Sequence, residues 1–480
     1  MGWRAQRKEK EERKKMPKDL RTFIEALGSD LLTVEREVDP VNELAELASQ
    51  APGPILFKAI KDYESWRVID DLVRTRKSQS LAMGASSQGV VRHLAQVLAA
   101  QGGEIKHVQT GPVKERIFIG EKANIFDIPI TKMSDIDAGR FIGSGMNITK
   151  DPETGNRNVA CLRMQAKGPR KMGVMMVPRH TWVQFSKYEA LGRDMPMAVA
   201  IGHHPAWDIA TNVSGSYEMD EFMVASRLLG EPAELVPAET IDIDVPAHAE
   251  IVIEGYVKAG VREEEGPFGE FTCFFSGEGR NPVFEVTAIT MRHDAIFRSI
   301  QATEFTEHQS LIGLPIEADI YRRVSSLHGG SLDVHDVMVP IWGSAWLVVL
   351  KLTAHYEGEV KDALMSALSC NYLHPKIAIA VDEDVDIENP ADLWWAVSTR
   401  VNPEKDIIRT EGNRIHPMDP SCPQISPPGE KTWQRMGGKM GIDATKPSLF
   451  RKEERSRFTR CRPMGWGSVR LEDFVKGLGK

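Results

Sequence analysis

The pattern of extended segments changes twice along the chain, and this change limits the folds that the sequence can adopt. Between about residues 116 and 300, short apolar or alternating runs are separated by Gly, Pro, Asn and Asp. Such runs predict a predominantly antiparallel sheet or barrel. On both sides of this region, apolar runs of strand length alternate with segments of helical spacing, which is typical of α/β organisation. The sequence therefore predicts an α/β region, a β region and a second α/β region in that order.

Individual elements follow from the same periodicity. In the first region, helices are predicted at 20–27, 41–47 and 90–99, and strands at 31–38 and 54–60. In the second region, strands are predicted at 158–166, 173–177, 197–201, 250–257, 283–291 and 295–300, with a helix at 219–229. His293-Asp294 is interpreted as the hairpin turn between the last two strands. In the third region, a strand at 345–352, a helix at 360–368 and a strand at 376–381 are predicted.

The predicted domains are an N-terminal α/β domain, a central β domain and a C-terminal α/β domain with a tail. Their boundaries are 20–115, 116–300 and 301–480. Residues 1–19 are rich in Lys and Arg but lack the apolar run of a signal peptide, so they are interpreted as a solvated extension. The acidic run 382–386 is interpreted as a solvated loop, since such loops are common.

Composition excludes several classes of protein. A length of 480 residues is too great for one simple core, and a net charge of −8 argues against a general nucleic-acid binder. The five cysteines form no C-x-x-C pair, which argues against a disulfide framework or a zinc site and fits a reducing cytoplasm. No apolar run approaches the ~18 residues that span a bilayer. A soluble cytoplasmic protein without a membrane partner is expected.

One turn, Glu264-Glu265-Gly266-Pro267-Phe268-Gly269-Glu270, carries two acids that could work as a pair. Glu265 and Glu270 are five residues apart, so a regular strand would send them to opposite faces. Proline fixes φ and glycine permits turns that a side chain would forbid, so this segment can point both acids at one place. The alternative is a solvated acidic turn. We call this segment the acidic turn.

Three scattered residues offer ligands that suit a divalent cation. Asn158, His180 and Glu221 supply an amide oxygen, an imidazole nitrogen and a carboxylate, a mixture that suits Mn²⁺. Their spacing alone leaves them as scattered polar residues. Arg163 follows Asn158 by five residues, so a regular strand would place the two on opposite faces unless it is bulged or bent.

Taken together, several segments resemble the UbiD family of prenylated-FMN-dependent decarboxylases, from about Phe23 to Lys446. The resemblance rests on Asn158-Val159-Ala160-Cys161-Leu162-Arg163, Pro178-Arg179-His180, Glu221, Glu234-Leu235-Val236, the acidic turn, Trp394-Trp395-Ala396-Val397-Ser398-Thr399-Arg400 and Gly438-Lys439-Met440-Gly441-Ile442-Asp443-Ala444-Thr445. No single string is decisive, but their joint order and spacing are highly specific. The resemblance implies a mixed α+β fold in which a central split β-barrel binds the flavin, between an N-terminal α/β domain and a C-terminal α/β domain engaged in dimer contacts.

The resemblance also implies a set of site residues. Arg163, Glu265 and Glu270 match the catalytic network of the family, and Asn158, His180 and Glu221 match its Mn²⁺ ligands, which bridge the cofactor phosphate. The implied contacts to prenylated FMN are Asn158, Cys161, Leu162, Arg163, Arg179, His180, Glu221 and Lys439. Arg179 departs from the family, which frequently carries glutamine there. A K⁺ ion is left open, because the matching stretch 210–213 differs in its side chains.

The implied activity is the reversible, non-oxidative decarboxylation of an aromatic, heteroaromatic or α,β-unsaturated carboxylic acid. In this scheme Arg163 orients the substrate carboxylate, Glu270 donates the proton that replaces CO₂, and Glu265 holds Arg163. A flavin prenyltransferase would supply the cofactor, and the chain would form a homodimer or a higher homo-oligomer. The alternatives are a catalytically silent flavin-binding or assembly protein and a metal-dependent hydrolase that uses the glutamates and His180.

The remaining candidates have plainer interpretations. His308, with Glu304 and Glu307, falls where the family shapes its substrate pocket, and 311–314 makes part of that pocket apolar. His203-His204 is expected at the end of a strand. Three methionines are expected in the core, Met172, Met175 and Met176.

Overall fold

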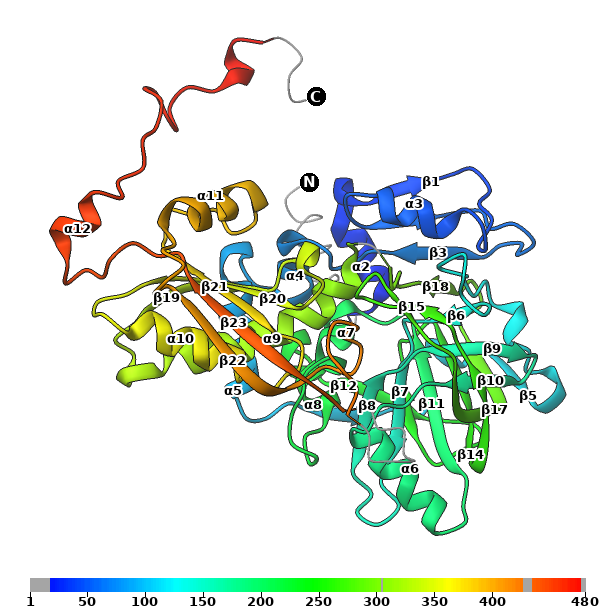
Figure 1. The fold of residues 1–480 in the computed structure, drawn as a ribbon. Helices are drawn as coiled ribbons and strands as arrows, with labels where there is room; N and C mark the ends of the chain where they lie inside the picture. The colour runs from blue at the N-terminus through cyan, green and yellow to red at the C-terminus, as the bar shows by residue number, and fades with distance from the viewer. Residues whose placement is uncertain (1–17, 304, 426–433, 476–480) are drawn as a thin grey trace.

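The structure, a computed structural model, describes residues 18–303, 305–425 and 434–475 (Figure 1). Most of the predicted basic extension and Glu304 therefore lie outside the described residues. The last residue of that extension is not solvated, because Asp19 is buried and its carboxylate accepts the amide of Thr22 at the start of helix α2 (Leu20–Leu27). A side-chain acceptor at this position satisfies one of the free amides of the first turn.

The N-terminal region forms a four-stranded sheet with helices packed around it (Figure 1). Its strand order is β1-β2-β3-β18. The bounds are β1 Leu32–Val34, β2 Ile55–Phe57, β3 Arg67–Asp70, β18 Ile296–Arg298, α3 Leu44–Gln50, α4 Arg76–Met83 and α5 Val90–Ala99. The predicted helices 20–27 and 90–99 are confirmed, and the predicted strands at 31–38 and 54–60 are present but shorter. Helix α4 escaped prediction because it has few apolar residues and depends on a capping box between Thr75 and Ser78.

The predicted hairpin at His293-Asp294 is wrong. Strand β18 runs parallel to β3 in the N-terminal sheet and does not pair with β17 (Gly279–Met291). Asp294 shows why the chain crosses over: its carboxylate accepts a bond from Arg21 at 3.0 Å, and its carbonyl accepts one from Arg67 at 2.9 Å. The turn is thus held by the N-terminal region, and the next strand continues there.

The central region is a curved, half-barrel sheet of nine strands (Figure 1). Its order is β6-β9-β10-β17-β14-β11-β7-β8, with β5 also paired to β17, and each of these pairings is antiparallel, as predicted. The bounds are β5 Arg116–Ile119, β6 Phe141–Ile142, β7 Met146–Lys150, β8 Arg157–Cys161, β9 Met164–Gly168, β10 Lys171–Val174, β11 Met195–Ile201 and β14 Ile251–Glu265. Met172, Met175 and Met176 are buried, which confirms the core interpretation.

Helices and a small sheet join the central sheet to the rest of the molecule. Helices α6 (His180–Ala190), α7 (Pro205–Thr211) and α8 (Glu221–Leu229) follow strands of the half-barrel, and only α8 was predicted. The small sheet has the order β13-β12-β4, and its bounds are β4 Ile105–His107, β12 Ala233–Pro237 and β13 Asp244–Pro246. Two strands beyond the half-barrel, β15 (Phe268–Gly269) and β16 (Phe275–Ser276), pair with each other next to the acidic turn.

The C-terminal region is a five-stranded sheet that follows the long helix α9 (Glu307–Ser325). The strand order is β19-β20-β21-β23-β22. The bounds are β19 Asp333–Met338, β20 Leu347–Thr353, β21 Ile377–Val381, β22 Ile407–Ile415, β23 Arg435–Asp443, α10 Glu359–Leu368, α11 Pro390–Arg400 and α12 Lys452–Ser456. Strands β20 and β21 are parallel and are joined by α10, which confirms the predicted strand, helix and strand.

The acidic run 382–386 is not the solvated loop that the sequence predicted. Asp382 is fully buried and forms ion pairs with Arg455 at 2.6 Å and Arg400 at 3.5 Å. Asp384 pairs with Lys446 at 3.1 Å. Cations from later segments neutralise the run, so it packs where isolated acids could not.

Two further features concern the described residues. None of their helices is both long enough and apolar enough to cross a membrane. After α12, the chain runs away from the body of the molecule in an extended path (Figure 1).

Candidate active site

The acidic turn brings its two carboxylates to the same place. Strand β14 ends at Glu265, and Gly266 adopts φ of +87°, a conformation that favours glycine. A Cβ on Gly266 would lie 3.5 Å from Nη2 of Arg163, so the turn passes close to that guanidinium. The chain then enters β15 and presents Glu270 one residue beyond that strand.

Arg163 joins the two carboxylates. It lies in the gap between β8 and β9, so the predicted strand 158–166 is interrupted at the point where its side chain must turn. Its Nε is 2.9 Å from Oε1 of Glu265, and its Nη2 is 2.7 Å from Oε2 of the same residue. Its Nη1 contacts Glu270 Oε1 and Ser276 Oγ. The pairing with Glu265 is bidentate, which is a strong geometry for arginine and carboxylate.

Burial gives the two acids different roles. The side chains of Arg163, Glu265 and Glu270 are 8%, 0% and 6% exposed. Glu265 also accepts a bond of 2.9 Å from the amide nitrogen of Asn281, so several donors surround its carboxylate. Burial raises the pKa of Glu270, although the nearby Arg163 opposes this shift. One guanidinium cannot neutralise two buried carboxylates, so Glu270 is the one suited to hold a proton.

Further bonds fix the backbone of the turn. The amide of Gly269 donates to Oδ1 of Asp137 at 2.8 Å, and the amide of Glu270 donates to the carbonyl of Phe274 at 3.0 Å. Asp137, Ser276 and Asn281 were all missed by the sequence analysis. Asn281 left the one usable signal, an amide at the start of an apolar strand, whereas the other two lie in ordinary polar loops.

The three predicted metal ligands also come together. Asn158 is on β8, and its amide nitrogen donates to Thr181 Oγ1 at 2.9 Å, directly after His180 at the start of α6. Glu221 begins α8, and its carboxylate accepts the amide of Val159 at 3.1 Å. The oxygen of the Asn158 amide is thereby left to face a cation. Across the described segments, no cluster of three or more His, Cys, Asp or Glu could hold a metal, so this set depends on its amide.

The electrostatics of these ligands suit a cation. Asn158 and Glu221 are buried. Burial raises the pKa of Glu221 to about 8, and burial together with Arg179 lowers the pKa of His180. A neutral imidazole is the form that binds a metal, and a buried carboxylate gains most from a nearby positive charge.

Two predicted cofactor contacts are cations without an acidic partner. Arg179 precedes α6 and donates to Ser214 Oγ at 3.3 Å, and Lys439 on β23 donates to the carbonyl of Leu368. Burial lowers the pKa of both side chains. Within the part of the chain that is described, neither forms an ion pair with a carboxylate. Such groups fit an anion like a phosphate.

The other predicted contacts differ in their surroundings. Cys161 ends β8, and its thiol bonds to the carbonyl of Gly143 at 3.2 Å; its side chain is accessible, yet burial raises its pKa to about 12. An accessible group so enclosed by protein lines an internal space. Leu162 packs in the core of the half-barrel. In the stretch considered for K⁺, Thr211 and Asn212 bond to carbonyls of their own helix, and that site stays a prediction.

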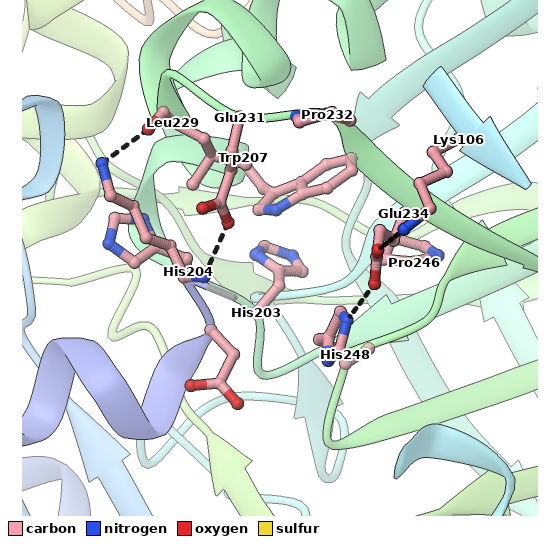
Figure 2. A pocket seen from close by; sticks show the side chains of 13 residues that line it. Lys106, His203, His204, Trp207, Leu229, Glu231, Pro232, Glu234, Pro246 and His248 are labelled. Carbon is pink, nitrogen blue, oxygen red and sulfur yellow. Dashed lines mark hydrogen bonds and ion pairs between the residues drawn. The ribbon is translucent and has the colours of Figure 1, made fainter. Parts of the chain in front are cut away.

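A separate cavity of about 210 Å³ lies between β12 and the start of α7 (Figure 2). Figure 2 shows Glu234 between Lys106 and His248, at 2.7 and 2.8 Å, with His203 and His204 nearby. The histidines follow β11, which confirms their predicted place at a strand end. The lining contains none of the predicted catalytic, metal or cofactor residues.

Comparisons with known proteins agree with this arrangement. Sequence models of the 3-octaprenyl-4-hydroxybenzoate carboxy-lyase N-terminal, Rift-related and C-terminal domains match residues 27–98, 106–304 and 309–444. Anhydromevalonate phosphate decarboxylase from Methanothermobacter thermautotrophicus is 31% identical over 450 residues, which cover 92% of this chain and all of that protein. Phenolic acid decarboxylase from Bacillus subtilis is 29% identical over 451 residues, covering 89% and 92% of the two chains.

Solved structures show the same relationship. The UbiD-class enzyme HmfF from Pelotomaculum thermopropionicum, in complex with FMN, superposes with a TM-score of 0.86 at 34% identity, covering 95% of this chain and all of that chain. The 3,4-dihydroxybenzoic acid decarboxylase AroY from Klebsiella pneumoniae superposes with a TM-score of 0.84 at 26% identity, covering 96% and 100%.

The half-barrel fold with its buried arginine and glutamates defines a carboxy-lyase. The chain belongs to the UbiD family.

Proposed function

We propose that this protein removes CO₂ non-oxidatively from an aromatic, heteroaromatic or α,β-unsaturated carboxylic acid with the help of prenylated FMN, and that the same site runs in reverse at high CO₂. The observation that carries this proposal is the buried contact of Arg163 with both Glu265 and Glu270. The FMN and prenylated FMN complexes of the neighbour HmfF support the cofactor assignment.

Prenylated FMN would supply the electron sink for CO₂ loss, which no amino-acid side chain provides. Asn158, His180 and Glu221 would hold Mn²⁺ together with the cofactor phosphate. Arg179 and Lys439 would add positive charge around that phosphate, which their lack of carboxylate partners favours. The thiol of Cys161, at the end of β8, would contact the cofactor within the same enclosed space, with Leu162 behind it in the core.

Arg163 is suited to orient the substrate carboxylate. A guanidinium has five N–H donors. Two of them bond to Glu265, and Nη1 serves Glu270 and Ser276, so one N–H of Nη2 remains for the substrate. Glu265, itself held by Asn281, fixes the plane of the guanidinium. The raised pKa of Glu270 lets it keep a proton, which it would deliver to the carbon that has lost CO₂.

The decisive experiment replaces Glu270 by Gln, which keeps the shape but removes the proton. We expect turnover to fall by a factor of ~10²–10⁴ while flavin binding survives. Glu264→Gln is the matched control, because Glu264 belongs to the same turn but is exposed. Substantial activity in Glu270→Gln would contradict the role assigned to this residue.

Cofactor and metal are tested by co-expression with a flavin prenyltransferase, followed by an absorbance spectrum, the mass of the bound cofactor and metal analysis. His180→Ala and Glu221→Ala should lose bound Mn²⁺ and retain less flavin. A preparation that retains no flavin would reject the proposal. A colourless protein active with Mn²⁺ alone would favour a metal-dependent hydrolase.

We also infer a homo-oligomer, for which the dimeric form of an evolved HmfF is the supporting observation. The division into domains at residues 116 and 301 belongs to the same proposal, as does the supply of cofactor by a prenyltransferase. Size-exclusion chromatography with light scattering tests the first of these points.

A further inference from the structure

Five aromatic and imidazole rings gather directly after the proton donor of the proposed site. Phe271 follows Glu270 in the chain, and its ring centroid lies 5.9 Å from His308, 5.5 Å from Trp346, 5.5 Å from His374 and 5.6 Å from His416. His374 and His416 lie 4.3 Å apart. We call these five residues the ring cluster. Its members come from the acidic turn, the start of α9 and three segments of the C-terminal region.

The hydrogen bonds of two histidines fix which ring nitrogen carries the proton. Nδ1 of His308 lies 3.4 Å from the carbonyl oxygen of Ala302, which can only accept, so Nδ1 carries the hydrogen. In a neutral ring, Nε2 of His308 is then an acceptor. Nδ1 of His416 accepts the amide of Met418 at 3.2 Å, so its Nε2 carries the hydrogen and is a donor.

The rings are neutral at pH 7. Burial lowers the pKa of His308 to about 4 and, with a contribution from Arg179, the pKa of His416 to about 3. Burial also lowers the pKa of His374 well below its usual value. Nδ1 of His374 is buried and has no hydrogen-bond partner among the described residues. An unsatisfied polar atom of this kind is costly in the free protein and favours a ligand that can bond to it.

The side chains of His308, Trp346 and His416 are not sealed in the core, because each remains partly accessible. The ring cluster therefore combines flat apolar faces, one imidazole acceptor and one imidazole donor within reach of Glu270. Flat faces pack well against an aromatic ring. The charged groups that act on the cluster are Arg179, which is already assigned to the phosphate, and Asp419.

We propose that the ring cluster contacts the end of the substrate remote from its carboxylate and selects an aromatic ring that carries a hydroxyl group. A hydroxyl both donates and accepts, so it can satisfy Nε2 of His308 and Nε2–H of His416 together. A second carboxylate only accepts, so it would face the lone pair of His308 and lose its hydration without a matching cation. This inference rests on the proposed decarboxylase function and adds the substituent that the site selects.

The test compares three acids of similar shape on the flavin-loaded enzyme: 4-hydroxybenzoic, benzoic and terephthalic acid. We expect kcat/KM for the hydroxylated acid to exceed that of each of the other two by ~10-fold or more, since a site built around a hydroxyl rejects analogues without one. His308→Phe and His416→Phe should each reduce this preference to less than ~3-fold, while turnover of benzoic acid changes little. His355→Phe is the matched control, because His355 lies outside the cluster and is exposed.

Calorimetric binding of the same acids to the holoenzyme provides a second readout that needs no turnover. Preferential binding of the hydroxylated acid that is lost in His416→Phe, without turnover of any acid, would support the ring cluster while the proposed decarboxylation fails. Turnover of all three acids at similar kcat/KM would overturn the inference and leave the decarboxylase function standing. An unchanged preference in both histidine variants would also overturn it.

Discussion

Arg298 offers a sharp test of how burial sets the cost of breaking an ion pair. It stands at the end of β18, is fully buried, and lies 3.0 Å from Oδ2 of Asp208 and 2.8 Å from Oε1 of Glu307. These partners belong to α7 and to the start of α9. Arg298→Met would keep most of the volume but leave two carboxylates buried without their cation. Breaking a buried pair in this way costs about 3–5 kcal/mol.

The assay is thermal unfolding of the purified protein followed by circular dichroism. A loss of about 3–5 kcal/mol corresponds to a fall of about 6–20 °C in the melting temperature of a domain of 150–250 residues. The matched control is Arg170→Met, because Arg170 pairs with Glu121 at 2.5 Å on the surface, where both side chains are exposed. An exposed pair contributes only about 0–1 kcal/mol.

A combined variant separates charge from packing. Adding Asp208→Asn and Glu307→Gln to Arg298→Met removes the uncompensated charges, so part of the lost stability should return. If Arg298→Met melts within about 2 °C of Arg170→Met, burial does not determine the cost here and the reasoning fails.

Three further predictions concern single groups. The pKa of about 12 keeps Cys161 protonated at pH 8, so iodoacetamide should label it more slowly than the exposed Cys461; peptide mass spectrometry measures this, and equal labelling would contradict it. Burial and Glu307 raise the pKa of Asp71 above its ordinary value of 3.8, so the native state binds more protons than the unfolded state and stability should fall as pH rises above about 4; Asp71→Asn should flatten that slope in urea titrations. Asn281→Leu should lower kcat without loss of flavin, as seen by paired kinetics and absorbance, because Glu265 loses one of its donors.

Local periodicity predicted the elements that are buried on a regular face. The helices at 20–27 and 90–99 and the strands around 197–201 and 345–352 were found because their apolar residues repeat at the spacing of the element. Strand β14 was predicted only as far as Val257, because its remaining residues are mostly polar and are held by pairing with β17. Such pairing leaves no local signal.

The site was even less accessible to local reasoning. Arg163 and Glu265 are 102 positions apart, and their contact depends on the sheet that separates them in sequence. The spacing of Arg163 from Asn158 argued against a shared pocket, and only the interruption between β8 and β9 removes that objection. The resemblance to the UbiD family supplied these residues, whereas His374 and His416 carry no motif and emerge only from the three-dimensional packing.

Strand β18 has a consequence for how the chain must assemble. Its Ile296 pairs with Arg67, so the last strand of the N-terminal sheet is made only after the whole half-barrel has been synthesised. Contacts so distant in sequence form late and slowly. During translation the edge of β3 would stay open, a template for pairing with other chains. A fragment ending near residue 115 should therefore aggregate, and the N-terminal region should acquire protection against proteolysis only when β18 arrives.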